Sequence, residues 1–189
     1  GQVLFGFFSE ATSISMLSII SNVSLIKKIY VTKWLFPFSS VTFSFVNAIF
    51  SLIAVFIIVF FTGGKFYWSY FLIPVVYIYL FVFSLGIGLI LASVTVFFRD
   101  MMYLYNVLLT ILMYLTPIFY PENIIPEEYK TLVSLNPLIY FLKYFRKLIL
   151  EGVVPGVDLN ITCLLISIIS LVIGIFVFKF KENQFVLDI

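Results

Sequence analysis

Long apolar runs separated by short charged stretches organise this chain. Asp, Glu, Lys and Arg are absent from residues 34–64, 66–98, 101–121 and 159–178. A helix needs about 20 residues to cross the hydrocarbon core of a bilayer, and each run is at least that long. Only helices and closed barrels satisfy their backbone in lipid, and the runs lack the polar–apolar alternation of barrel strands. The pattern predicts an all-α, polytopic bundle of transmembrane helices.

Five spans are expected, and the first is the weakest because it carries Glu10 and many hydroxyl side chains. Their expected bounds are 3–25, 38–63, 70–96, 101–119 and 159–178. Pro37 suits the start of the second span, since proline is tolerated in the first helical turn. The aromatic residues just before the third span suit the membrane interface. A long connection, residues 120–158, separates the fourth and fifth spans.

Composition supports a membrane protein and gives catalysis little support. The 189 residues are 63% hydrophobic and 11% charged, whereas soluble domains carry about 25% charged residues. The chain has no histidine and a single cysteine, Cys163, so a Ser–His pair, a histidine metal site and a disulfide framework are not expected. The glycines before Lys65 lack the spacing of a phosphate loop. Any energy source is therefore expected on another chain.

The placement of basic residues predicts the orientation. Alternate loops carry six basic residues on one side and five on the other. The six that lie close to the membrane in short loops are Lys27, Lys28, Lys33, Arg99, Lys179 and Lys181. Because the positive-inside rule acts through short loops, we expect this set on the cytoplasmic side.

Residues 25–37, LIKKIYVTKWLFP, gather three of these lysines within seven positions. A lysine cluster at a membrane edge commonly fixes topology and binds anionic lipid, which is one explanation. The stretch is also longer than a turn requires and interleaves Tyr30 and Trp34 with the lysines. That mixture is typical of a short helix on the cytoplasmic face that is available to a partner.

The long connection predicts two short helices on the outer side, the first beginning at Pro126. In the second, Asn136 can cap, Pro137 can start and Gly152 can end the helix. Its basic arc holds Lys143, Arg146 and Lys147, and its apolar arc holds Leu138, Phe141, Leu142, Phe145, Leu148 and Ile149. So short an amphipathic helix lies in the interface or dips in and returns. It is either a surface anchor or part of a lid over the outer mouth.

Polar side chains inside the spans are candidates for a transport path. Hydroxyl residues recur at every third position from Ser9 to Ser24. This spacing winds around a helix, so we expect close helix packing rather than a pore face. Glu10 is an intramembrane acid, a functional candidate by default, but it lies near the outer end of its predicted span, where interfacial exposure explains it equally well. We expect no acid at mid-span, which disfavours an ion-coupled transporter.

Four blocks of sequence, taken in order, resemble the ABC-2 type permeases. They are FFSE at 7–10, LIKKIYVTKWLFPFSS at 25–40, FFRDMMYLYNVLLTILMYLTPIFYPENIIP at 97–126 and LNPLIYFLKYFRKLILEG at 135–152. The most similar group is the exporters of O-antigen, teichoic acid and related polysaccharides. One departure is Thr32, where the family usually has proline. The resemblance covers residues 1–189 as a single transmembrane domain, without the N-terminal cytoplasmic helix and first span that such permeases have.

The resemblance implies a non-catalytic permease subunit with residues in three roles. Those implied to couple to a cytoplasmic ABC ATPase subunit are Lys27, Lys28, Tyr30, Lys33, Trp34, Arg99 and Asp100. Those implied for an outer gate are Pro117, Asn136, Pro137, Lys143, Arg146 and Lys147. Those implied to line a channel are Glu10, Tyr103 and Tyr114. The two tyrosines share a helix face, and aromatic rings suit sugar faces, although packing or lipid contact also explains them.

The implied cargo is a lipid-linked glycan that crosses a bacterial inner membrane. A second permease copy and membrane lipid are the further expected partners, and no nucleic acid is expected. ATP and Mg²⁺ would bind the ATPase subunit, so we expect no cofactor or metal in this chain. A drug or lipid exporter of the same superfamily is the alternative, followed by an ion-coupled secondary transporter. A membrane enzyme would need a His or Asp cluster at a membrane face, and the sequence offers none.

Overall fold

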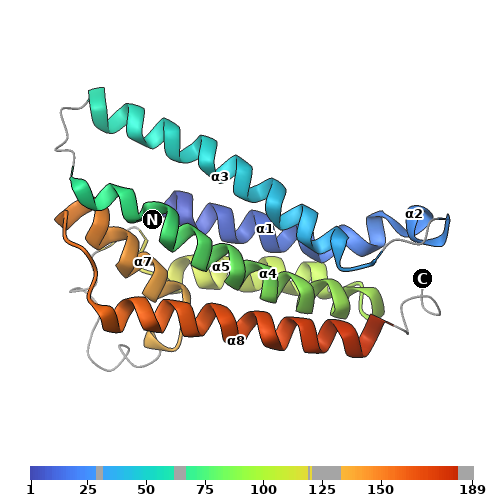
Figure 1. Ribbon diagram of the computed structural model, residues 1–189. Helices are drawn as coiled ribbons and strands as arrows, with labels where there is room; N and C mark the ends of the chain where they lie inside the picture. The colour runs from blue at the N-terminus through green and yellow to red at the C-terminus, as the bar shows by residue number, and fades with distance from the viewer. Residues whose placement is uncertain (29–31, 62–66, 119, 121–132, 183–189) are drawn as a thin grey trace.

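The computed structural model describes residues 1–28, 32–61, 67–118, 120 and 133–182, which form a bundle of helices (Figure 1). The elements are α1 (Gln2–Ser21), α2 (Val23–Lys28), α3 (Leu35–Phe61), η1 (Trp68–Leu72), α4 (Ile73–Phe97), α5 (Met101–Leu115), α7 (Leu138–Arg146), η3 (Lys147–Glu151) and α8 (Val157–Glu182). Four of the described helices are long and apolar enough to cross a membrane, with η1 and α4 counted together. The all-α prediction is confirmed.

The fourth predicted span is shorter than expected because of a proline. α5 has 15 residues and ends at Leu115, and Thr116 after it has an extended backbone, with φ −82° and ψ 125°. A proline ring pushes the preceding residue out of the helical region, and Pro117 follows Thr116. At about 1.5 Å per residue, α5 is shorter than a hydrocarbon core of about 30 Å.

Hydroxyl side chains of α1 lie at tight helix contacts, as their spacing predicts. Thr12, Ser15 and Ser18 are all buried. A Cβ atom added at Gly88 of α4 would lie 2.5 Å from the Ser15 hydroxyl oxygen, and Tyr105 of α5 donates a 2.6 Å hydrogen bond to the Thr12 hydroxyl. Helices in lipid associate through close packing and polar contacts rather than through the hydrophobic effect. These contacts therefore position α1 against α4 and α5.

Small side chains also join α4 to α8. Ser167 donates a 2.8 Å hydrogen bond to the Tyr79 carbonyl of α4. Ser170 donates a 3.1 Å hydrogen bond to the Phe83 carbonyl one turn further along. A Cβ atom added at Gly86 would lie 2.4 Å from the carbonyl group of Ser170. The two backbones approach so closely that only a glycine fits at this position of α4.

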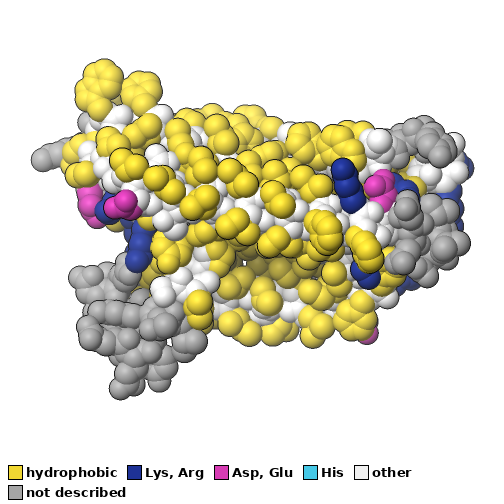
Figure 2. Space-filling model, turned by 60° about the horizontal axis from the view of Figure 1, so that its bottom comes forward, with side chains coloured by type: hydrophobic (Ala, Val, Ile, Leu, Met, Phe, Trp, Pro, Cys, Tyr) yellow, Lys and Arg dark blue, Asp and Glu magenta, His cyan; other side chains and the backbone are white. Residues whose placement is uncertain are grey.

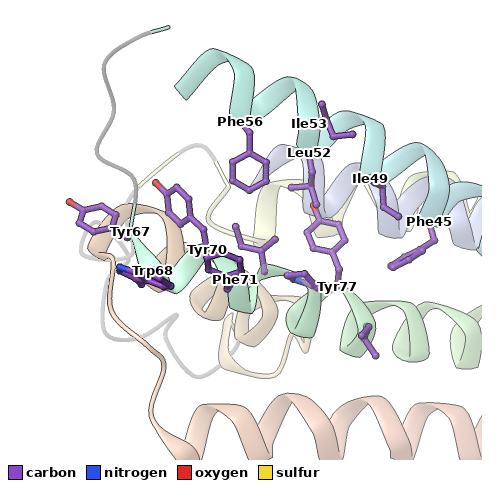
Figure 3. Close-up of a pocket in the computed structure, with 13 residues that line it drawn as sticks. Phe45, Ile49, Leu52, Ile53, Phe56, Tyr67, Trp68, Tyr70, Phe71 and Tyr77 are labelled. Carbon is purple, nitrogen blue, oxygen red and sulfur yellow. The ribbon is translucent and has the colours of Figure 1, made fainter. Parts of the chain in front are cut away.

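The second half of α3 leaves the bundle. Its buried residues, Pro37, Val41, Ser44 and Ala48, all lie in its first half. Figure 1 shows the helix diverging toward its C-terminal end, where Phe61 is 82% exposed. The divergence leaves a cavity of about 860 Å³ between α3, η1 and the start of α4 (Figure 3). Aromatic and aliphatic side chains line it, including Phe45, Leu52 and Phe56 from α3 and Tyr70, Phe71 and Tyr77 from the other wall.

The second outer helix packs into the bundle, which favours the re-entrant interpretation over a surface anchor. Phe141 and Leu148 of its predicted apolar arc are fully buried. Ile139 and Tyr144, which are not part of that arc, are each only 1% exposed. Gly152 ends η3 with a left-handed backbone, φ 67°, as predicted. Of the first predicted outer helix, residues up to 132 lie outside the described part of the chain.

Apart from Glu10, the charged side chains of the described residues gather at the two ends of the bundle. Figure 2 shows a broad hydrophobic band between them on the face it presents. The band corresponds to the charge-free runs of the sequence, which form the central parts of the long helices. The loops therefore alternate between two ends, as the sequence predicts.

Candidate functional site

Residues implied to couple to an ATPase lie at one end of the bundle. Lys27 and Lys28 are exposed in the last turn of α2. Trp34, just before α3, is 48% exposed. Arg99 and Asp100 are exposed in the turn between α4 and α5. Figure 1 shows α2, the start of α3 and the end of α4 at the same end, so two segments far apart in sequence share one surface.

The last turn of α8 supports both of these segments. Lys33 Nζ donates a 2.6 Å hydrogen bond to the backbone carbonyl of Glu182. A cation is favourable there because the last carbonyls of a helix lack partners and carry partial negative charge. Lys181 Nζ lies 4.4 Å from the centroid of the Phe97 ring at the end of α4. Tyr30, the other aromatic residue implied for this surface, lies outside the described residues.

At the opposite end, residues implied for an outer gate form one polar cluster. Asn136 Nδ2 donates a 2.8 Å hydrogen bond to Thr116 Oγ1. The Asn136 side-chain oxygen accepts a 3.0 Å hydrogen bond from the backbone N–H of Leu138, the first residue of α7. The Arg146 guanidinium donates to the Pro117 carbonyl and, at 3.3 Å, to the carbonyl of the next residue. Both side chains fasten α7 to the segment where α5 stops.

The remaining gate residues lie on α7 or directly beside its ends. Pro137 occupies the N-cap position of α7. Lys143 of α7 and Lys147, the first residue of η3, are both half-buried. Burial raises the pKa of the Tyr144 hydroxyl, so this side chain stays neutral. Aromatic contacts hold α7 against α4, and the ring centroids of Phe83 and Phe141 lie 5.4 Å apart.

η1 packs against η3 beside this cluster. Ser69 donates a 2.8 Å hydrogen bond to the Leu148 carbonyl. A Cβ atom added at Gly152 would lie 2.4 Å from the Tyr67 ring, so a glycine at this position permits both the left-handed turn and the close approach of η1. η1 and η3 thus meet at this end, beside α7, which packs into the bundle.

α5 has an exposed side that carries two tyrosines. Tyr103 is 69% exposed and Tyr114 is 70% exposed. Since they are eleven positions apart, they share one side of the helix. The other exposed apolar side chains of α5 are Leu104, Val107, Leu108, Ile111 and Leu115. This side is available to lipid, to a second copy of the chain or to a transported molecule.

Glu10 lies deeper than the sequence suggests. Its Oε1 atom accepts a 2.9 Å hydrogen bond from Asn47 Nδ2, and Asn47 lies beside the midpoint of α3 (Leu35–Phe61). The placement of Glu10 near an outer edge is wrong, and so is the expectation that no acid occurs at mid-span. The error came from the first predicted span, 3–25, because α1 ends earlier, where Asn22 Nδ2 bonds the Ser18 carbonyl at 2.7 Å.

The order of these elements agrees with a known family. The family model described as "ABC-2 type transporter" matches residues 1–150. The chain belongs to the ABC-2 type transporter family. The match extends from α1 through most of η3, so it includes Lys27, Trp34 and the Arg99–Asp100 turn at one end of this ABC-2 permease and Asn136 and Arg146 at the other. Together with its apolar helices, membership makes the chain a multi-pass membrane protein.

Curated relatives of this ABC-2 permease are named for glycan export. The O-antigen export system permease protein RfbA of Klebsiella pneumoniae is 27% identical over 183 residues, which are 95% of this chain and 69% of the relative. A second RfbA of that organism is 28% identical over 181 residues, with the same coverage. The polysialic acid transport protein KpsM of Escherichia coli is 30% identical over 105 residues, 55% of this chain and 40% of the relative.

Sequence reasoning missed three polar partners of its own candidates: Asn47, Thr116 and the carbonyl of Glu182. For Asn47 a signal was present, since it is the single carboxamide residue in the charge-free run 34–64. For Thr116 the signal was its position before Pro117, which forces it out of the helix. The contact with Glu182 uses a backbone atom 149 positions from Lys33, and no sequence pattern identifies it.

Proposed function

We propose that this ABC-2 permease is the membrane subunit of an exporter that moves lipid-linked polysaccharide across a bacterial inner membrane. The observation that carries the proposal is similarity over 95% of the chain to permeases named for O-antigen export. Membership of the family implies an ABC ATPase partner, and we place ATP hydrolysis and its Mg²⁺ on that separate subunit. The permease then contributes the path and the gate rather than the chemistry.

The coupling end receives the motion of the ATPase subunit in this proposal. The exposed lysines of α2 and the half-exposed Trp34 ring offer a charged and aromatic surface, and aromatic residues are common anchors of protein interfaces. The contacts of Lys33 and Lys181 connect this surface to α8. A push on the segment before α3 is thus transmitted to α8, which is packed along α4.

The outer cluster acts as the gate. α5 stops at Thr116, and α7 is tied to that point by Asn136 and Arg146. A displacement of α5 would therefore carry α7 with it, moving the short helices at the outer end. Two permease copies would enclose the channel with the exposed sides of their α5 helices, where Tyr103 and Tyr114 could stack on sugar rings.

The two tryptophans of the chain give a matched test. Trp34 lies at the coupling end, and Trp68, which is 88% exposed, lies in η1 at the other end. In cells that lack the native gene, surface polysaccharide is measured on intact cells that express the parent, Trp34→Ala or Trp68→Ala. We expect Trp34→Ala to lower surface polysaccharide by about tenfold or more, the scale of a lost interface anchor, with normal membrane insertion, and Trp68→Ala to match the parent.

Two results would count against the proposal. Parent-level export by Trp34→Ala would remove Trp34 from the coupling surface. A parent chain that leaves surface polysaccharide absent but restores resistance to apolar drugs would indicate the drug or lipid exporter instead.

A further inference from the structure

A carboxylate and a carboxamide form a hydrogen-bonded pair between the middle parts of two apolar helices. Glu10 of α1 accepts the 2.9 Å bond from Asn47 of α3, and both side chains are half-buried. Acidic side chains inside membranes are rare and face a partner, a cavity or the bundle interior. In this chain the partner is a neutral amide rather than a base. Such a pair joins two helices through a hydrogen bond rather than an ion pair.

The pair lies where α3 begins to diverge from the rest of the bundle (Figure 1). Ala48, the next residue after Asn47, is the last buried residue of α3. Beyond it no side chain of α3 is fully buried, and Leu52 and Phe56 are partly buried against the core. The cavity of about 860 Å³ opens along the same half of the helix, and Figure 3 shows the α3 side chains reaching toward η1 and α4 across it. The hydrogen bond therefore marks the boundary between the packed half of α3, which holds its buried side chains, and the half that contacts the core only through partly buried side chains.

The same two helices flank the proposed coupling segment. α1 ends at Ser21 and α3 begins at Leu35, so residues 22–34, with α2 and Trp34, connect them. On the coupling side of the pair, the two helices are held by contacts such as that of Val41 and Ser15 with Gly88 of α4. A hydrogen bond between helices in lipid adds a directional contact to their van der Waals packing. A single hydrogen bond at the boundary can thus determine how far along α3 the helix moves together with α1.

We propose that Glu10 and Asn47 are positioning residues that make α1 and the first half of α3 a single lever. Movement of residues 22–34 then moves both helices together, and the outer half of α3 pivots beyond Ala48, changing the width of the aromatic cavity. The bond, not the charge of Glu10, is the functional feature. This inference rests on the proposed function for its link to export, but the lever itself is a property of the fold.

The lever is tested by a distance measurement on the full-length protein in lipid. Cys163, the single cysteine of the chain, is first replaced by alanine. Spin labels are then placed at Ile57 in the outer half of α3 and at Ile169 of α8, which are 51% and 55% exposed. In the matched control the α3 label moves to Phe43, 60% exposed in the packed half, and the α8 label stays at Ile169.

Glu10→Leu is expected to change the distance between the labels at Ile57 and Ile169 but not the distance between those at Phe43 and Ile169. The equilibrium between narrow and wide separations should shift about threefold, the effect of a typical interhelical hydrogen bond in a membrane. Glu10→Gln keeps an oxygen acceptor and should match the parent. Asn47→Leu should reproduce Glu10→Leu, and the double variant should add nothing further because both changes remove the same bond. Unchanged distances in Glu10→Leu, or a shift of the Phe43 pair as large as that of the Ile57 pair, would overturn the lever.

The link to export is tested by the amount of polysaccharide exported per ATP hydrolysed with the ATPase partner present. A purely structural role lowers the amount of folded protein but leaves this ratio unchanged, whereas a positioning role lowers the ratio in Glu10→Leu and preserves it in Glu10→Gln. A Glu10→Gln chain as defective as Glu10→Leu would overturn the inference in favour of a charge-dependent role such as ion coupling. If the parent exports no polysaccharide, the proposed function fails, and the distance measurement still decides the lever.

Discussion

At the scale of single residues, the outer cluster depends on two side chains that satisfy backbone and hydroxyl groups left open by a broken helix. Pro117 stops α5, and the carbonyls after that point have no helical partner. Arg146 donates to them from α7, and Asn136 bonds the Thr116 hydroxyl. A guanidinium can serve several carbonyls at once because its donors are arranged in a planar fork.

Arg146→Ala should therefore weaken the outer end more than the loss of the next cation along the chain. Each carbonyl left buried and unpaired costs about 1–3 kcal/mol, so we expect a clear drop in the midpoint of thermal unfolding in detergent. Lys147→Ala, which removes a neighbouring half-buried cation, is the control and should have a smaller effect. Equal midpoints for the two variants would show that the carbonyl contacts of Arg146 contribute nothing to stability.

At the scale of elements, the sequence predicted the existence of the helices better than their contacts. Charge-free runs located α3, α4 and α8 because an apolar helix in lipid needs no partner to be stable as a helix. Gly152 ended the second outer helix as predicted, whereas its N-cap is Pro137, one residue after the predicted Asn136. The burial of Ile139 and Tyr144 was not predictable, since α7 packs on faces that its amphipathic pattern does not reveal.

The seam between α4 and α8 gives a prediction at this scale. In Gly86→Ala the added methyl group would lie 2.4 Å from the backbone of Ser170, so the helices must separate. Overpacking of this kind costs about 1–3 kcal/mol. Gly6→Ala is the matched control, because a Cβ atom there meets nothing within 4 Å. Only Gly86→Ala should lower the midpoint temperature of thermal unfolding. A Gly86→Ala variant that unfolds at the same temperature as the parent would mean that α4 and α8 pack less closely than the structure indicates.

At the scale of the whole molecule, two ends with different chemistry are joined by an apolar band. The sequence located both ends from charge placement, and the resemblance supplied their roles. The sequence-based prediction misplaced Glu10 because a local break at Asn22 ends α1, and hydropathy does not locate such breaks. The hydrogen bond from Lys33 to the end of α8 was missed because a contact between residues 149 positions apart depends on how the helices assemble.

The exposed side of α5 gives a prediction for the assembled transporter. If two copies enclose an aqueous path along α5, cysteines at Tyr103→Cys and Tyr114→Cys should react with a hydrophilic maleimide faster than Ile169→Cys. Ile169 of α8 is 55% exposed and should face hydrocarbon, where thiolates do not form. Reaction rates that are equally slow at all three positions would place the tyrosines against lipid.

The measurement that tests the central claim most directly is purification of the full-length permease from its native membranes in mild detergent, with cross-linking through Trp34→Cys in a Cys163→Ala background. The account predicts that a subunit with a phosphate loop co-purifies in equal amounts and cross-links through Trp34→Cys but not through Trp68→Cys. A permease that purifies without an ATPase and forms no cross-link would contradict the account, and its lysine cluster would then be a topology anchor.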